Sequence, residues 1–188
     1  LAEKSDQVGI ATGLAYTQAG GDILFIEVVT MPGKGNITLT GQLGNVMKES
    51  AKAALSYVKS HAKELGLDSR VINRSDIHIH VPEGAVPKDG PSAGLAITTA
   101  IISAFGKRPT RRDLAMTGKV TLRGRALEIG GMKEKIIAAH RAGIKHVILP
   151  KDNEKNLVDI PKKVQKDLKF HFVDSMADVV KLVFAKQK

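Results

Sequence analysis

The amino-terminal part of the chain alternates between apolar runs and glycine-rich turns. Residues 8–17 and 23–31 are rich in apolar and β-branched side chains, and the turn Gly20-Gly21-Asp22 lies between them. Two strand-like runs around a Gly-Gly turn predict a β-hairpin. A short strand is predicted next, at residues 37–40.

Two helices are then predicted from different hydrophobic patterns. Apolar side chains recur every three or four positions in residues 44–65, which predicts an amphipathic helix ending near Gly66. Its apolar positions are Val46, Met47, Ala51, Ala54, Leu55, Val58 and Ala62. Residues 95–105 are almost wholly apolar, so this second helix should be buried on most sides. Its first turn is predicted at Pro91-Ser92-Ala93-Gly94, with Pro91 at the first helical position.

The remaining segments predict short strands and two more helices. Strict alternation at residues 76–81 indicates a strand with one buried face. Further strands are expected at 114–122, 126–129, 147–149 and 170–173, and helices at 132–142 and from Ser175 onward. Hairpins mixed with helix-bearing crossovers predict an α+β fold, or a mixed α/β fold, in which helices pack on a mixed sheet.

Length and composition narrow the class of protein. The 188 residues suit one compact domain, and 43% hydrophobic with 26% charged residues excludes wholesale disorder. No apolar run approaches the roughly 18 residues of a membrane-spanning helix. The first residue is Leu1, and no signal sequence follows it, so we expect a piece of a longer protein. The absence of cysteine excludes disulfides, thiolate metal sites and cysteine nucleophiles.

The formal net charge of +10 is concentrated in the middle of the chain. Residues 1–106 carry a net charge of −1, residues 107–145 carry +8, and residues 146–188 carry +3. A basic segment of this kind can attract nucleic acid or an acidic protein partner, or it can form a solvated face or a subunit contact. Aromatic residues make up only 4% of the chain, which disfavours a stacking platform for single strands.

Ser92 is the candidate nucleophile. It lies at the predicted amino end of a buried helix, where free N–H groups and the helix dipole favour a developing anion. Acyl transfer by a hydroxyl group needs this environment, although a serine at a helix start is also a common capping residue.

A hydroxyl nucleophile needs a base, and the sequence offers two kinds. His78 and His80 share one face of a strand and could act as a base or as metal ligands, or could simply be packed imidazoles. Lys135 shares a small apolar helix face with Met132, Ala138, Ala139 and Ala142, and burial there would lower its pKa. Periodicity alone leaves Lys133 as an alternative. No P-loop, HExxH, EF-hand or GxSxG pattern occurs, so no cofactor-binding or metal site is predicted.

Several motifs together resemble one family. PKDGPSAG at residues 87–94 follows DIHIHVPEG at 76–84, and AMTGKVTLRG and GGMKEKIIAAHRAGI occupy 115–124 and 130–144. These segments resemble the proteolytic domain of Lon proteases of the A subfamily, and the resemblance extends over residues 1–188. It implies a compact α+β domain of the Lon-protease type, similar to domain 2 of certain ribosomal proteins.

The resemblance also assigns roles to individual residues. It implies that Ser92 is the nucleophile, that Lys135 is its general base, and that Thr117 hydrogen-bonds the catalytic ammonium group. Asp89 falls in the loop whose conformation is associated with open or occluded sites. Lys119 stands where the family usually has Glu, Glu128 replaces a usual Pro, and Met132 a usual Leu. A positive charge near a lysine base would lower its pKa further.

The same resemblance implies a biological setting. We expect an ATP-dependent serine endopeptidase acting on unfolded, damaged and regulatory proteins, as a hexameric ring in the full-length protein. An AAA+ ATPase domain that uses ATP and Mg²⁺ would precede this segment, and DNA binding could be an added property. The expected location is the bacterial cytoplasm, or alternatively the mitochondrial matrix, with no membrane contact. The alternative function is a non-catalytic Lon-like assembly or nucleic-acid-binding module.

Overall fold

A mixed sheet forms the centre of the molecule. The structure, a computed structural model, describes residues 6–17, 20–82 and 92–186. The strands are β1 (Ile10–Thr17), β2 (Gly20–Pro32), β3 (Ile37–Thr40), β4 (Ser75–His80), β5 (Leu114–Met116), β8 (His146–Pro150) and β9 (Lys169–Val173), with β6 (Lys119–Val120) and β7 (Ala126–Leu127) forming a separate two-stranded ribbon. The helices are α1 (Asn45–Ser60), α2 (Ser69–Asn73), α3 (Gly94–Gly106), α4 (Met132–Arg141), α5 (Lys162–Asp167) and α6 (Met176–Val183), with a 3₁₀ segment η1 (Lys151–Asp159).

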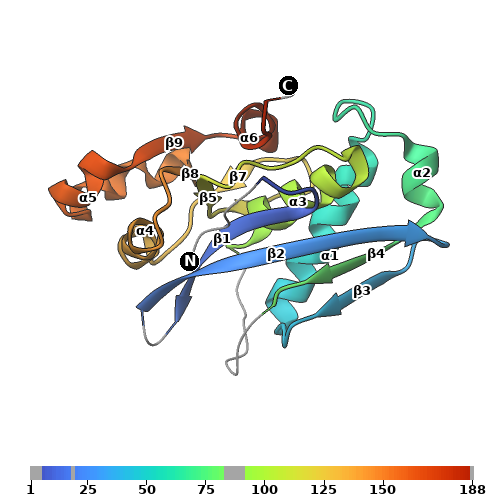
Figure 1. Cartoon of the computed structure of the whole chain (residues 1–188), viewed down its shortest axis with the longest axis horizontal. Helices are drawn as coiled ribbons and strands as arrows, with labels where there is room; N and C mark the ends of the chain where they lie inside the picture. The colour runs from blue at the N-terminus through green and yellow to red at the C-terminus, as the bar shows by residue number, and fades with distance from the viewer. Residues whose placement is uncertain (1–5, 18–19, 83–91, 187–188) are drawn as a thin grey trace.

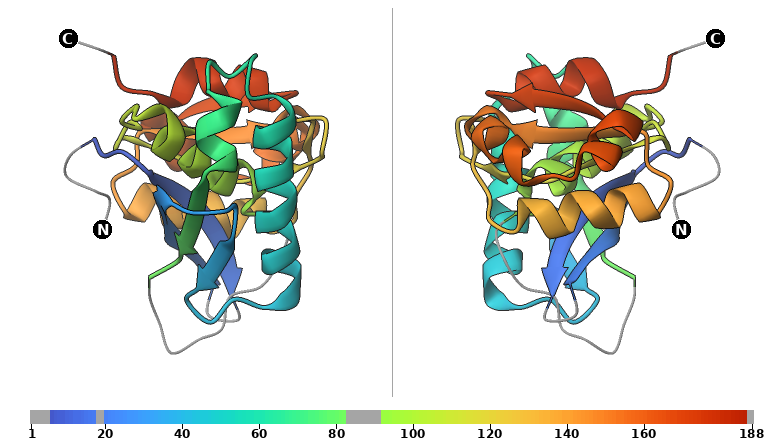
Figure 2. Two further views of the ribbon diagram at one scale, coloured as in Figure 1. Left: turned by 90° about the vertical axis from the view of Figure 1, so that its right-hand side faces the viewer. Right: turned by 90° about the vertical axis from the view of Figure 1, so that its left-hand side faces the viewer.

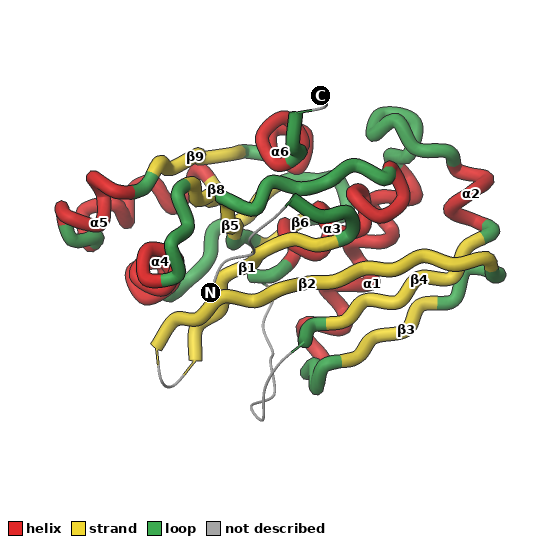
Figure 3. Tube along the Cα trace, in the orientation of Figure 1, coloured by secondary structure: helices red, strands yellow, loops and turns green. Residues whose placement is uncertain are grey.

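The sheet combines two antiparallel pairs, β4–β2 and β2–β1, with parallel pairs on either side of them, one of which is β3–β4. Its strand order is β3-β4-β2-β1-β5-β8-β9, and the β3, β4 and β2 strands run side by side in Figure 3. β1 and β2 form the predicted hairpin, and β2 pairs with β4 in the same antiparallel manner. The pairs β1–β5, β5–β8 and β8–β9 are parallel, as crossover connections through helices require.

Helices cover the two faces of the sheet with two separate hydrophobic cores. The larger core joins α1, α3 and α6 to one face of the central strands (Figure 1). The smaller core lies under α4, which packs across β1 and β2 and is seen along its length in the right-hand view of Figure 2. The α+β prediction, with helices packed on a mixed sheet, is therefore confirmed.

The amphipathic helix forms as predicted but is shorter. Met47, Ala51, Ala54, Leu55 and Val58 are buried on its inner face, whereas Val46 is exposed. α1 ends at Ser60, and the chain continues in turns to Gly66, whose positive φ of 73° allows it to leave the turn.

The single strand predicted at residues 114–122 is wrong in extent. β5 ends at Met116, and β6 begins at Lys119 as part of another sheet. The two residues between β5 and β6 hydrogen-bond to other segments of the chain: Thr117 N–H donates to the Ile148 carbonyl, and Gly118 N–H donates to the Ser92 carbonyl.

α3 is buried along its length, as its composition predicts. Its polar side chains are all hydrogen-bonded: Thr98 Oγ1 donates to the Gly94 carbonyl, Thr99 Oγ1 donates to Met116 Sδ, and Ser103 Oγ bonds both Gly9 N–H and the Arg108 carbonyl. The predicted start at Pro91 is wrong, because the helix begins at Gly94. Pro91 itself lies outside the described residues.

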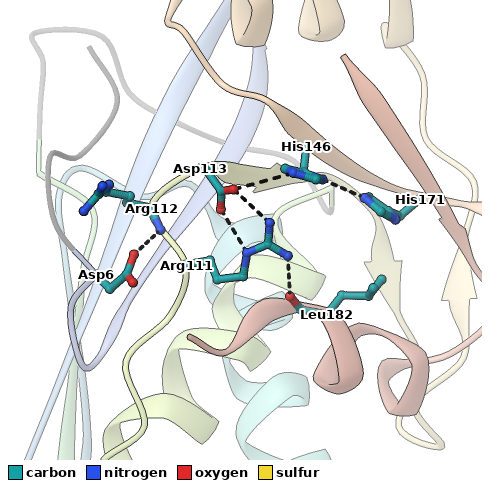
Figure 4. Close-up of polar contacts among 7 residues, drawn as sticks. All are labelled: Asp6, Arg111, Arg112, Asp113, His146, His171 and Leu182. Atoms are coloured by element: carbon teal, nitrogen blue, oxygen red, sulfur yellow. Dashed lines mark hydrogen bonds and ion pairs between the residues drawn. The ribbon is translucent and has the colours of Figure 1, made fainter. Parts of the chain in front are cut away.

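Part of the basic segment holds the carboxy-terminal helix in place. The guanidinium group of Arg111 bonds the Asp113 carboxylate and donates to the Leu182 carbonyl (Figure 4). Arg108 lies over the Phe184 ring, 4.0 Å from its centroid. These two arginines have internal partners, so they do not belong to a freely solvated basic face.

Asp113 links this arginine to a pair of stacked histidines. His146 Nε2 lies 3.5 Å from Asp113 Oδ2, and His146 Nδ1 lies 2.9 Å from His171 Nε2 (Figure 4). Burial lowers the pKa of both imidazoles, and the Arg111 charge lowers both further. Burial raises the pKa of Asp113, but the Arg111 guanidinium outweighs it and holds that pKa below its usual value. Both histidines therefore favour the neutral form in the folded protein.

This histidine pair predicts a loss of stability in mild acid. The histidine pKa values are lowered on folding, so the unfolded chain takes up more protons as the pH falls through 6.5, and the free energy of unfolding decreases. In chemical denaturation between pH 7.5 and 5, we expect the double variant His146→Asn/His171→Asn to lose less stability than the wild type. His61→Asn, outside the pair, should follow the wild-type curve. Parallel curves for the double variant and wild type would contradict the prediction.

Candidate active site

Lys135 is the buried lysine of α4. The helix lies directly on β2 because Gly21 has no side chain: a Cβ there would lie 2.1 Å from the Glu134 carbonyl oxygen. Because of this contact, one side of α4 packs into the smaller core. Lys135 is only 3% exposed, whereas Lys133 is exposed. Burial thus distinguishes the two lysines that periodicity left as alternatives.

The amino group of Lys135 contacts a buried hydroxyl. Lys135 Nζ donates to Thr117 Oγ1 at 3.3 Å, and Thr117 is fully buried. Burial, and to a smaller extent the positive charge of Lys119, lower the pKa of Lys135 to about 8. At pH 7 a lysine with this pKa is neutral in about one molecule in ten, against well under one in a thousand at its ordinary pKa. The arrangement therefore supplies a lysine that can accept a proton near neutral pH.

Ser92 lies in the turn before α3, half-buried. Gly118 holds this turn from both sides: its N–H donates to the Ser92 carbonyl at 2.9 Å, and its carbonyl accepts from Leu95 N–H at 3.1 Å. Gly118 directly follows Thr117, so the peptide that holds Ser92 adjoins the residue that holds Lys135. These bonds also explain why the helix starts late, since the first intrahelical bond runs from Ile97 N–H to the Ala93 carbonyl.

The other predicted residues are not part of this arrangement. Asp89 lies outside the described residues. His78 Nε2 and His80 Nδ1 both hydrogen-bond Thr40 Oγ1, at 2.8 and 2.6 Å, on the outward side of β4. Within residues 6–17, 20–82 and 92–186, no group of three or more His, Asp or Glu side chains could hold a metal ion.

Asn153 is a supporting residue that no sequence pattern marks. Asn153 is 1% exposed, and its amide both accepts from Ile129 N–H and donates to the Ile129 carbonyl, which braces the chain just before α4. Asn153 lies in a charged stretch that looks solvated in sequence, so no local signal marks it. Lys155 of the same segment pairs with Glu128 at 3.0 Å.

Comparison with known proteins identifies the class and then the family. A buried lysine bonded to Thr117, next to the glycine that holds the Ser92 turn, is an arrangement compatible with hydrolytic acyl transfer. Residues 1–186 match the family model of the Lon protease (S16) C-terminal proteolytic domain, and the chain belongs to this family.

Its relatives are bacterial Lon proteases. The chain is 59% identical over 181 residues to Lon protease 1 of Syntrophobacter fumaroxidans, 54% identical over 185 residues to Lon protease of Dictyoglomus thermophilum, and 57% identical over 187 residues to Lon protease of Brevibacillus choshinensis. These alignments cover 96%, 98% and 100% of the chain but only 22%, 23% and 24% of the relatives. The chain thus spans about a quarter of their length. Family membership does not favour the alternative of a non-catalytic or nucleic-acid-binding module. None of the helices in the described part is long and apolar enough to cross a membrane.

The close approach of α3 and β6 gives a test of the site. A Cβ at Gly94 would lie 2.9 Å from Val120 N and 3.3 Å from the Gly118 carbonyl oxygen, so Gly94→Ala must push β6 away from the Ser92 turn. The φ of Gly94 is not positive, so alanine fits the backbone there and the cost in stability is confined to this contact. We therefore expect peptidase activity to fall about 10-fold or more, with a smaller change in the thermal midpoint.

Gly130→Ala is the matched control for this substitution. A Cβ at Gly130 meets open space just before α4, so activity and stability should stay near wild type. Unchanged activity in Gly94→Ala would show that the spacing between α3 and β6 is not critical for the site.

Proposed function

We propose that this domain hydrolyses peptide bonds with Ser92 as nucleophile and Lys135 as general base. The main support is the buried amino group of Lys135, which combines a lowered pKa with a hydrogen bond to Thr117. The backbone bond from Gly118 to Ser92 adds a direct link between the two halves of the site. Membership of the proteolytic-domain family supports the reaction class.

In the first half of the proposed reaction, neutral Lys135 takes the proton of the Ser92 hydroxyl as Ser92 Oγ attacks the peptide carbonyl carbon. The resulting lysine ammonium group then gives that proton to the leaving amine as the C–N bond breaks, leaving an ester on Ser92. In the second half, Lys135 takes a proton from water as the water oxygen attacks the ester carbon; the bond from that carbon to Ser92 Oγ then breaks, Ser92 Oγ takes the proton back from Lys135, and the carboxylic acid product leaves. Burial of Lys135 favours this cycle because it makes the neutral amine accessible near neutral pH.

The developing oxyanion needs backbone N–H donors close to Ser92. Leu95 N–H is already bonded to the Gly118 carbonyl, so it is not a free donor for this role.

We further propose that the domain works within a longer protein, because the chain covers only about a quarter of the length of each of these relatives. In that protein a linked AAA+ ATPase would use ATP and Mg²⁺ to deliver unfolded polypeptides to a ring of six such domains. The bacterial relatives favour a cytoplasmic location. No chemical step at Ser92 or Lys135 requires ATP.

Substitution of either proposed catalytic residue should abolish cleavage of an unfolded protein such as casein. Ser92→Ala removes the nucleophile and Lys135→Met replaces the buried amine with an apolar side chain of similar length, so each should lower kcat/KM by about 10³-fold or more. Circular dichroism and thermal melts should report a retained fold.

The wild-type enzyme should show a pH dependence set by Lys135. Its kcat/KM should rise with pH through about 8, because neutral Lys135 is the active form.

Lys133→Met is the matched control for the lysine substitution. Lys133 lies on the same helix but is exposed, so this variant should keep both the rate and the pH dependence of the wild type. Near-normal turnover by purified Ser92→Ala or Lys135→Met would refute the proposed dyad.

Thr117→Val tests the hydroxyl that contacts Lys135. The substitution keeps the shape of the side chain but leaves Lys135 Nζ without this partner in a buried site, which should cost about 1–3 kcal/mol of stability. We expect kcat/KM to fall about 10-fold through loss of lysine positioning. Thr117→Ser keeps the hydroxyl and should restore most of both quantities; equal defects in the two variants would argue against the hydrogen bond as the cause.

A further inference from the structure

Lys119 is held firmly beside the proposed catalytic pair. It follows Gly118, whose two backbone bonds hold the Ser92 turn, and it lies two residues after Thr117, the partner of Lys135. On its other side β6 is fixed by antiparallel pairing of Lys119 with Leu127. A Cβ at Gly94 would lie 3.5 Å from the Lys119 carbonyl carbon, so the start of α3 packs against this backbone. The backbone of the half-buried Lys119 is therefore fixed next to the Thr117–Gly118 connection.

Lys135 is a buried amine with a neutral partner. Its hydrogen bond goes to the Thr117 hydroxyl, and no carboxylate of the described residues lies within ion-pair distance of its Nζ. A buried ammonium group without a counter-ion is strongly disfavoured. A second positive charge nearby disfavours it further, and the low polarity of the surroundings makes that repulsion effective.

The charged groups on the neighbouring elements do not offset this repulsion by an ion pair. α4 packs against β1, β2, η1 and α5, and its own charged or titratable residues besides Lys135 are Lys133, Glu134, His140 and Arg141. β1 has no charged side chain, and the other three elements carry Asp22, Glu27, Lys151, Asp152, Glu154, Lys155, Asp159, Lys162, Lys163, Lys166 and Asp167. Of the acidic members, Asp167 pairs with His140, and Asp22 accepts from Ile23 N–H.

We propose that Lys119 is a positioning residue of the active site, which keeps Lys135 in its neutral, proton-accepting form. This proposal rests on the proposed role of Lys135 as general base. Lys119 acts through its charge and makes no contact with the reacting atoms. Burial is the larger cause of the lowered Lys135 pKa, and the Lys119 charge adds to it in the same direction.

Charge variants of Lys119 test this role through the pH profile. Lys119→Glu reverses the charge and should raise the pKa of Lys135, so the rise of kcat/KM should move to higher pH. At pH 7 we expect a fall of about 10-fold, with wild-type rates recovered above the new pKa. Lys119→Gln removes the charge and should shift the profile in the same direction by about half as much. Lys166→Glu makes the same change of charge on the exposed surface of α5 and should leave the profile unchanged.

A direct titration of Lys135 separates this proposal from the proposed catalytic dyad. In ¹³C-lysine-labelled protein carrying Ser92→Ala, the Lys135 signal, assigned by its loss in Lys135→Met, should titrate at higher pH when Lys119 is replaced by Glu. This readout needs no activity, so it stands even if Ser92 proves not to be the nucleophile. An unchanged Lys135 titration would overturn the proposal, whatever the effect of the substitution on activity. If Lys119→Glu fails to fold, the same comparison is made with Lys119→Gln.

Discussion

The parallel pairing of β1 with β5 is the constraint on which the sheet and the site both depend. It joins the mixed strands β3, β4, β2 and β1 to the parallel strands β5, β8 and β9, with Gly13 opposite Met116. β5 ends at that residue, so Thr117 and Gly118 leave the sheet where α3 crosses it. The site is thus assembled at the join between the two halves, from α3, the β5–β6 connection and α4. A change that opens this join would disturb the Thr117–Gly118 connection, which bonds both the Ser92 turn and Lys135.

Local patterns predicted the elements well where burial is periodic or complete. The inner face of α1, the buried α3 and the β1–β2 hairpin all follow from apolar spacing and turn residues. The start of α3 at Gly94 and the break in the strand expected at residues 114–122 could not be predicted from such local patterns. Both depend on bonds between Gly118 and the Ser92 turn, which connect segments distant in sequence. The nucleophile and base were proposed from motif resemblance, whereas the contrast in exposure between Lys133 and Lys135 becomes visible only in three dimensions.

The charged residues of the basic segment, residues 107–145, have different roles. Arg108 and Arg111 stabilise the carboxy-terminal helix through an aromatic ring and a carbonyl group. Lys119 lies at the site, where its charge acts on another lysine. A net charge of +8 over residues 107–145 therefore does not describe one continuous binding surface. The distribution of charge along the sequence marks an unusual segment, but it does not distinguish basic side chains with internal partners from those on the surface.

The two ends of the described chain meet at Thr110. Gln7 bridges to it on one side and Phe184 on the other, and Ala185 N–H donates to the Pro109 carbonyl at 2.8 Å. The two ends are thus tied to each other through one short segment that lies just before β5. Fraying of either end would remove a bridge from that segment and so loosen the start of the strand that leads into the β5–β6 connection.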